Sequence, residues 1–546
     1  MQSIKQYRKV YQTIQSITHL ESQTVGNHNA IDPHASTDPS GHGDKQDRDA
    51  NIHPFTHRPI PAPQNTRQVA EGEQRSCGSK DYCDPLNPQN WSYGYKWMVT
   101  GAVSLTSFIG TGASAIDSEI VPQLMESFGV GEEVALLGTA LFMIALGLGS
   151  LISAPFSEIL GRNPVYIVSL IIFGLFTMGA ALAPGIGSWL ACRFSAGLFS
   201  WPPLTNFGGT IADVWSPIER TYVFPVLLCL CFLGPFLAPM VAAFIGGSSV
   251  VNWQWTEWLT LILTGALVVT FLLFVPDTFP PVLLSWKATS LRKVTGNQLY
   301  LAEHEVDAIP LYRRLQRSIK LPLKLLLTEP IIQLFSLYMT VIYTVLFGFL
   351  PGYGFIFGAQ GIYGLDQAHT GLCFIGINVG FLLSICTVWP VYVRFKRKLF
   401  EARKEGKHKV VPEERLTHAI IGAPILPISI FWMGWSSWPS VSLWSPLAAS
   451  VAFGFAVMQL YISCYQYIID SYEIYAASAL VGMTLTRYCV AGPMVTVSVP
   501  MYENLGVHWT LTLLGCIATL LAPVPYVFKY YGAIARKRSK GATSFE

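Results

Sequence analysis

The chain has 546 residues, of which 51% are hydrophobic and only 13% charged, with a formal net charge of +3. Soluble globular proteins carry about a quarter charged residues, so this composition is unlike theirs and favours a protein of the lipid bilayer. The small net charge gives no reason to expect a nucleic-acid partner. The ten cysteines show no metal-ligand spacing, so we expect neither a disulfide framework nor a metal site.

The first 95 residues are polar and contain scattered Pro, Gln, Ser, Asp and His. Such a segment cannot bury enough apolar surface to fold alone, and it has no apolar core of a signal peptide. We therefore expect residues 1–95 to form a disordered cytosolic tail. A regulatory role for this tail stays open.

Apolar runs of about twenty residues, long enough to span a bilayer as helices, follow the tail. They lie at 97–122, 133–156, 164–184, 187–212, 221–246, 256–276, 331–356, 367–393, 417–437, 444–470, 475–501 and 507–528. We predict an all-α membrane protein whose 12 transmembrane helices form two bundles of six, at 96–276 and 331–528. A central loop at 277–330 joins the bundles, and a tail at 529–546 follows them.

Lys and Arg concentrate on one side of the predicted helices. The central segment, the eighth-to-ninth connection and the C-terminal tail are basic, whereas the loops on the other side hold acids and no Lys or Arg. Basic loops stay in the cytosol, so we expect both tails and the central loop to be cytosolic.

A weak internal repeat suggests that the two bundles are related. The fourth run ends at Asp213 and the fifth carries Gly234-Pro235, while the tenth ends at Asp470 and the eleventh carries Gly492-Pro493. The two Asp-to-Gly offsets are 21 and 22 residues. Parallel repeats of six helices build one large class of transporters, in which the substrate site lies between the halves.

A short polar turn from Ser157 to Pro164 separates the second and third runs. It resembles the signature loop between helices 2 and 3 of the major facilitator superfamily. The resemblance implies the major facilitator fold and a gating role for Glu158, Gly161 and Arg162. An ordinary cytoplasmic turn is the simpler alternative.

Further motifs resemble the fungal-type 12-span drug:proton antiporter branch of that family, which contains multidrug, polyamine and secondary-metabolite exporters. The matching segments are Asp84 to Trp91, Arg193 to Thr210, and the helix 5 motif formed by Gly234, Pro235 and Pro239. The chain departs from the family pattern at several positions. They are Ala154 and Asn163 in the gating turn and Ala238, Ala242 and Ala243 in the helix 5 motif.

Few charged side chains lie within the apolar runs, and charges at membrane depth are usually functional or paired. The resemblance implies a role in proton coupling for Arg193. A fixed cation beside an acid biases the acid's proton affinity, so Asp117 and Glu119 are the candidate titrating partners. Both acids could instead mark a wet helix end. Arg487, near the middle of the eleventh run, fits a substrate site or a structural ion pair equally well.

Polar and aromatic residues within the runs are candidates for a substrate cavity. They are Asn206, Tyr338, Tyr343, Gln459, Tyr461, Tyr465, Gln466 and Arg487. Aromatic walls with a few polar groups suit amphipathic organic ligands, and ordinary helix packing would use the same residue types.

The leading hypothesis is a proton-coupled secondary transporter that exports a small organic compound, such as a drug, toxin or secondary metabolite. The alternatives are an importer or exporter of a polyamine or organic acid, and a nutrient sensor that no longer transports. No P-loop or nucleophile elbow is present, so an enzyme is not expected. We expect no cofactor, a monomer in the plasma membrane or in a vacuolar or other endomembrane, and a small molecule, protons and lipid as partners.

Overall fold

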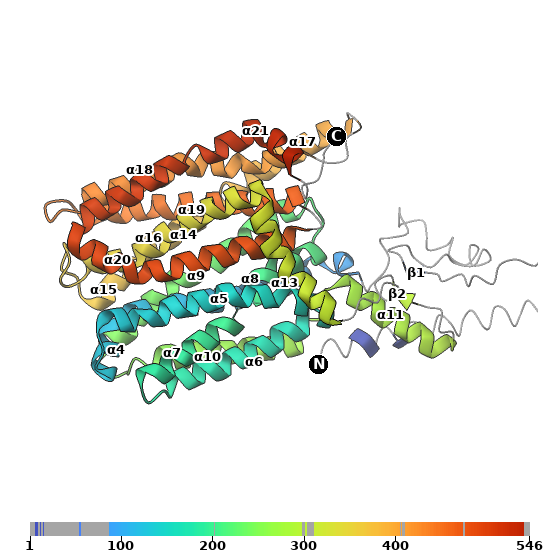
Figure 1. Ribbon diagram of the computed structural model, residues 1–546, viewed down its shortest axis with the longest axis horizontal. Helices are drawn as coiled ribbons and strands as arrows, with labels where there is room; N and C mark the ends of the chain where they lie inside the picture. The colour runs from blue at the N-terminus through green and yellow to red at the C-terminus, as the bar shows by residue number, and fades with distance from the viewer. Residues whose placement is uncertain are drawn as a thin grey trace, which may run out of the picture.

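The protein is described by a computed structural model covering residues 6–8, 11–12, 15, 54–55, 87–200, 202–296, 301–302, 311–404, 406, 410–472 and 475–539. The long helices run side by side along one direction (Figure 1). Within the described residues, ten helical segments are long and apolar enough to cross a membrane. The all-α membrane fold predicted from the sequence is confirmed.

The first half contains helices at the first six apolar runs and one short helix between the first two runs. They are α3 (Tyr93–Ala115) with the 3₁₀ turn η4 (Ile116–Glu119), α4 (Val121–Phe128), α5 (Glu132–Leu160), α6 (Arg162–Ala181), α7 (Ile186–Phe199), α8 (Pro202–Val214), α9 (Arg220–Gly246) and α10 (Trp255–Leu273). The predicted fourth span is divided into α7 and α8. Pro202 and Pro203 lack the backbone N–H that a continuous helix would need, which accounts for the break.

The second half repeats this arrangement. Its helices are α14 (Pro330–Phe357), α15 (Gln367–Leu372), α16 (Ile375–Ile385), α17 (Val388–Lys404), η5 (Pro412–Leu416), α18 (Thr417–Ser436), α19 (Trp444–Tyr472), α20 (Ala476–Leu521) and α21 (Val524–Arg538). The predicted eleventh and twelfth spans are joined in α20, and only Gly506, at φ 75° and ψ 168°, interrupts the helix between them. Glycine accepts this conformation readily. The ten long helical segments do not include the divided fourth span, and they count the eleventh and twelfth spans as one segment. Both differences together account for the twelve predicted crossings.

The central segment contains two helices, α11 (Pro280–Thr295) and α13 (Leu311–Thr328), where the sequence predicted only a polar loop. They lie at the same end of the bundles as α17 and the end of α21 (Figure 1). Helix α13 packs against α5 and α20, one helix from each half. The remaining described elements are short: η3 (Pro88–Asn90) and the parallel two-residue strands β1 (Pro54–Phe55) and β2 (Leu301–Ala302).

The two halves pack closely along α5 and α20 and along α9, α15 and α16. Small residues allow this approach: a Cβ added at Gly147 would lie 3.1 Å from the Cβ of Tyr488, and one at Gly492 would lie 2.9 Å from the Ala140 carbonyl oxygen. Membrane helices use such residues where their backbones meet. Large apolar side chains such as Leu175 are exposed on the outer faces, as a lipid-facing surface requires.

Candidate functional site

Three charged side chains from three separate elements meet inside the first half. Asp117 is on η4, Arg193 on α7 and Glu257 on α10, and each exposes only 1% of its side chain. The Arg193 guanidinium forms an ion pair with Asp117, and its Nη1 lies 3.4 Å from Glu257 Oε1. Its Nη2 also donates to the Ala113 carbonyl oxygen at 2.6 Å. We call Asp117, Arg193 and Glu257 the buried charge cluster.

Two aromatic rings lie close to the Arg193 guanidinium. The Arg193 guanidinium carbon lies 4.6 Å from the ring centre of Phe142 and 6.0 Å from that of Trp189. These positions allow cation–π attraction. Helix α3 ends at Ala115 and tightens into η4, which places Asp117 beside α7 and α10.

The structure brings Asp117 and Arg193 into contact, as the sequence predicted, but it places no contact between Arg193 and Glu119. The main-chain oxygen of Glu119 instead accepts a hydrogen bond from the Gln367 side chain. The structure adds Glu257 to the Asp117–Arg193 pair. The signal for Glu257 in the sequence was an acid within the first turn of an apolar helix, which is costly at membrane depth unless paired.

Glutamine side chains connect the halves at the end of the bundle that holds η4. Gln123 Nε2 lies 3.0 Å from Gln367 Oε1 and donates to the Gly246 carbonyl oxygen at 2.8 Å. Together with the bond from Gln367 to Glu119, they join α4, α9 and η4 of the first half to α15 of the second. We call these contacts the outer contact.

The gating turn lies at the opposite end and is held by a network around Arg162. Its Nε lies 3.2 Å from Asp213 Oδ2 at the end of α8, and its Nη1 donates to Ser157 Oγ at 2.9 Å. Gly161 has φ 94°, and a Cβ there would collide with the Asp277 carboxylate. Burial raises the pKa of Asp277, whose carboxylate accepts hydrogen bonds from the Phe279 and Arg162 backbone N–H groups.

The second half contains an equivalent ion pair. Arg415, just before α18, has its Nε 2.5 Å from Asp470 Oδ2 in the last turn of α19. Asp213 and Asp470 are the two aspartates of the sequence repeat. In each half, therefore, an arginine at the start of the third helix pairs with the aspartate that ends the fourth.

Arg415 also joins the halves at this end of the bundle. Its Nη1 donates to Thr221 Oγ1 at 2.8 Å, and Gln466 Nε2 donates to the Thr221 carbonyl oxygen at 3.4 Å. Thr221 lies in the first turn of α9. We call these bonds the inner contact. With the inner and outer contacts, side-chain hydrogen bonds join the two halves at both ends of the described structure.

A further buried arginine of the second half forms no ion pair with any carboxylate among the described residues. Arg487 on α20 exposes 2% of its surface. Its Nη1 donates to Tyr465 Oη at 2.8 Å, and the Tyr343 hydroxyl donates to the Tyr488 hydroxyl at 2.9 Å. Four tyrosine rings surround the guanidinium, and we call them the tyrosine box: Tyr343, Tyr461, Tyr465 and Tyr488.

Comparison with known proteins agrees with this architecture. A family model described as Major Facilitator Superfamily matches residues 102–496. The chain is 54% identical over 457 residues to the MFS-type transporter kojT of Aspergillus flavus, and the match covers 84% of this chain and 81% of that protein. The chain belongs to the major facilitator superfamily. It is thus a multi-pass membrane transporter of a class that works by alternating access.

One further relative and one solved structure are informative. This transporter is 32% identical to the MFS-type efflux pump MFS2 of Trichophyton rubrum, with 84% of this chain and 76% of that protein covered. The solved proton:xylose symporter XylE, from E. coli, shares the fold with a TM-score of 0.59 at 15% identity, over 80% of this chain and 97% of that chain. Both matches extend across the two halves.

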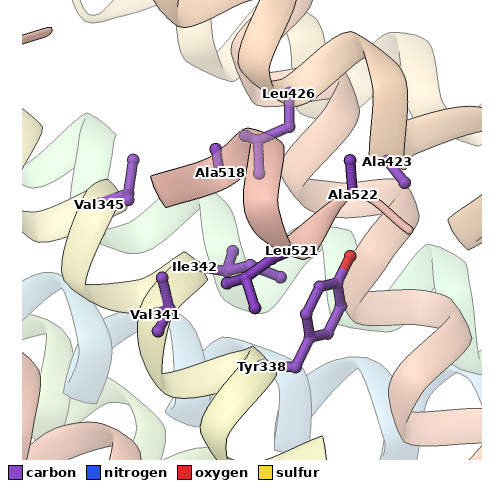
Figure 2. A pocket seen from close by; sticks show the side chains of 9 residues that line it. All are labelled: Tyr338, Val341, Ile342, Val345, Ala423, Leu426, Ala518, Leu521 and Ala522. Atoms are coloured by element: carbon purple, nitrogen blue, oxygen red, sulfur yellow. The ribbon is translucent and has the colours of Figure 1, made fainter. Parts of the chain in front are cut away.

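The other candidate residues of the transporter fall in different places. Asn206 Oδ1 accepts from Arg162 at 3.4 Å, within the gating network. Gln459 bonds to His418 and Thr387 within the second half, each at 2.6 Å. Tyr338 lines a small apolar hollow between α14, α18 and α20 (Figure 2). The structure thus brings Tyr343, Tyr461, Tyr465 and Arg487 together. Asn206, Gln459 and Tyr338 lie elsewhere.

The remaining predicted positions concern the backbone. A Cβ at Gly234 would collide with the Phe108 carbonyl oxygen of α3, so glycine permits α9 to approach α3 closely. Pro235 and Pro239 lie inside α9. The side chain of Glu158 lies outside the described part of the structure.

Proposed function

We propose that this transporter exports a small organic compound across the plasma membrane in exchange for protons. The observation that carries the proposal is the buried charge cluster, in which one arginine serves two carboxylates. Transport by alternating access then requires that protonation of this cluster favour one arrangement of the two halves over the other.

Without a bound proton, the cluster carries one excess negative charge. When both acids are ionised, Asp117 and Glu257 carry two negative charges against the single positive charge of Arg193. Each uncompensated charge at membrane depth costs about 3 kcal/mol. One proton on either carboxylate makes the cluster neutral, so we assign proton binding to the two acids and the role of permanent counter-charge to Arg193.

The position of Asp117 supports a link between the proton and the gates. Asp117 lies on η4, and two residues further along, Glu119 accepts the hydrogen bond from Gln367 in the second half. A change in the Asp117–Arg193 pairing that moves η4 would therefore act directly on the outer contact. The inner contact, held by Arg415 and Thr221, would have to open in the opposite part of the cycle.

Export is supported by the name of one relative. The 32% identical relative from Trichophyton rubrum is named an efflux pump. Export from the cell requires the plasma membrane, whereas the same machinery in a vacuolar membrane would load that organelle.

The test is disruption of the gene followed by comparison of intracellular and extracellular metabolites. We expect at least one compound to accumulate inside the cells and to fall outside. The wild-type gene and the control Glu401→Gln, at an exposed position on α17, should restore export, whereas Asp117→Asn should not. Reduced uptake would contradict export, and unchanged fluxes with altered transcription would indicate a sensor.

A further inference from the structure

Arg487 differs from the other buried arginines in what it contacts. Arg193, Arg415 and Arg536 each form an ion pair with at least one carboxylate. Within the described residues, no carboxylate pairs with Arg487. Its Nε and the hydroxyl of Tyr461 have no hydrogen-bond partner in this structure. Burial of a guanidinium without a counterion is costly, and a bound anion would lower that cost. The unpaired donor could form a hydrogen bond with such an anion.

The tyrosine box contacts Arg487 through aromatic rings, where the other buried arginines contact a carboxylate. The guanidinium carbon lies 4.7 Å from the ring centre of Tyr343 and 4.9 Å from that of Tyr488. The corresponding distances to Tyr461 and Tyr465 are 5.5 and 5.9 Å. Cation–π attraction can compensate part of the burial of a cation. It leaves the positive charge in place, so an anion that enters the box is still attracted.

The tyrosine box lies where the two halves meet. The ring of Tyr461 is 4.4 Å from that of Phe232, and the ring of Tyr465 is 6.2 Å from that of Phe224. Both phenylalanines are on α9 of the first half, and Gly147 of α5 packs against Tyr488. Separation of the halves during alternating access would therefore uncover the box toward the cavity between them.

We propose that Arg487 and the tyrosine box bind the anionic group of a planar, conjugated organic acid. This proposal rests on the proposed transport function and names its substrate class. A guanidinium matches a carboxylate with two parallel hydrogen bonds. Tyrosine rings stack on a conjugated ring system and present hydroxyls at its edge. An amine would meet the positive charge of Arg487 with no acid beside it, so a polyamine is disfavoured.

The test measures binding to the purified full-length protein in detergent, with three probes that share one ring system. The probes are 2-naphthoate, 2-naphthamide and 2-naphthylmethylamine, and the readout is the ligand-dependent shift of the thermal unfolding midpoint. We expect the wild-type protein to bind 2-naphthoate about tenfold or more tightly than the amide, because the anion adds charge-assisted hydrogen bonds. The amine should bind most weakly.

Variants separate ligand binding from a structural role. Arg487→Gln should lose the preference for 2-naphthoate while it still binds the amide. Arg487→Lys should keep the preference with weaker affinity, and the control Arg394→Gln, at an exposed position on α17, should behave as wild type. If Arg487→Gln does not fold, Arg487→Lys and the order of the three probes on the wild-type protein still decide the question.

The outcomes distinguish this proposal from the transport proposal. Equal binding of anion and amide by the wild-type protein, or an unchanged preference in Arg487→Gln, would overturn the substrate class. Neither result depends on a proton gradient. Transport by the wild-type protein that does not depend on a proton gradient, together with an intact anion preference, would contradict the proposed proton exchange alone.

Discussion

Removal of Arg193 from the buried charge cluster tests both the stability and the coupling that we assign to it. The comparison uses three forms of the protein. Arg193→Gln leaves the two carboxylates without a cation, Asp117→Asn leaves one acid and one base, and a triple variant neutralises Asp117, Arg193 and Glu257 together. The amide side chains keep approximately the size and shape of the acids.

The expected magnitudes follow from the geometry. Two unit charges separated by the 3.4 Å between Arg193 Nη1 and Glu257 Oε1 attract by about 5 kcal/mol at an effective dielectric constant of about 20. Loss of one partner from a buried ion pair costs roughly 3–5 kcal/mol. Arg193→Gln should therefore be strongly destabilised. The triple variant should regain most of that loss because it buries no charge.

The assay combines thermal unfolding in detergent with transport in proteoliposomes. The probe for transport is whichever compound the metabolite comparison identifies. Asp117→Asn should still exchange that compound across the membrane but should lose accumulation against a gradient and most of its dependence on pH. The triple variant should fold, and it should also lose accumulation against a gradient and most of the pH dependence.

Two results would refute this reasoning. Full uphill transport with normal pH dependence in both Asp117→Asn and Glu257→Gln would place the proton site elsewhere. A triple variant as unstable as Arg193→Gln would show that shape, not charge balance, holds the cluster together.

Three further predictions concern topology, gating and packing. A protease-accessible tag at 277–330 should stay protected in intact cells, because the basic segment is expected in the cytosol, and cleavage from outside would contradict the model. Arg162→Ala or Glu158→Ala should greatly lower the transport rate at normal protein abundance. Normal transport by both variants at equal surface expression would show that the turn only connects two helices. Gly234→Ala should destabilise the protein in detergent by about 1–3 kcal/mol because its Cβ meets backbone. The matched control Gly265→Ala has open space and should unfold at or above the wild-type temperature.

The sequence alone was sufficient for the membrane class and the order of its helices. Lengths and hydropathy of the apolar runs determine where helices cross a bilayer, because backbone polar groups there must be satisfied within each helix. The predicted pairing of Asp117 with Arg193 also came from the sequence, through the cost of charge at membrane depth and the resemblance of the arginine motif.

Helix ends were less predictable than helix positions. The sequence placed separate spans at 475–501 and 507–528, and the structure has two helices there that meet at the Gly506 kink within α20, with no loop between them. The central segment forms α11 and α13 despite its polar composition. Helix α13 is stabilised by packing against both halves, a contact that local sequence patterns do not reveal.

Apart from the Asp117–Arg193 pair, only the tertiary structure decided which distant residues meet. Glu257 joins Arg193 from 64 residues away, and four tyrosines gather around Arg487 from α14, α19 and α20. Asn206 and Tyr338, equally plausible in the sequence, lie at the gating turn and in a separate apolar hollow. The physical reason is that composition sets which helices form, whereas the rotation and neighbours of each helix depend on packing against the others.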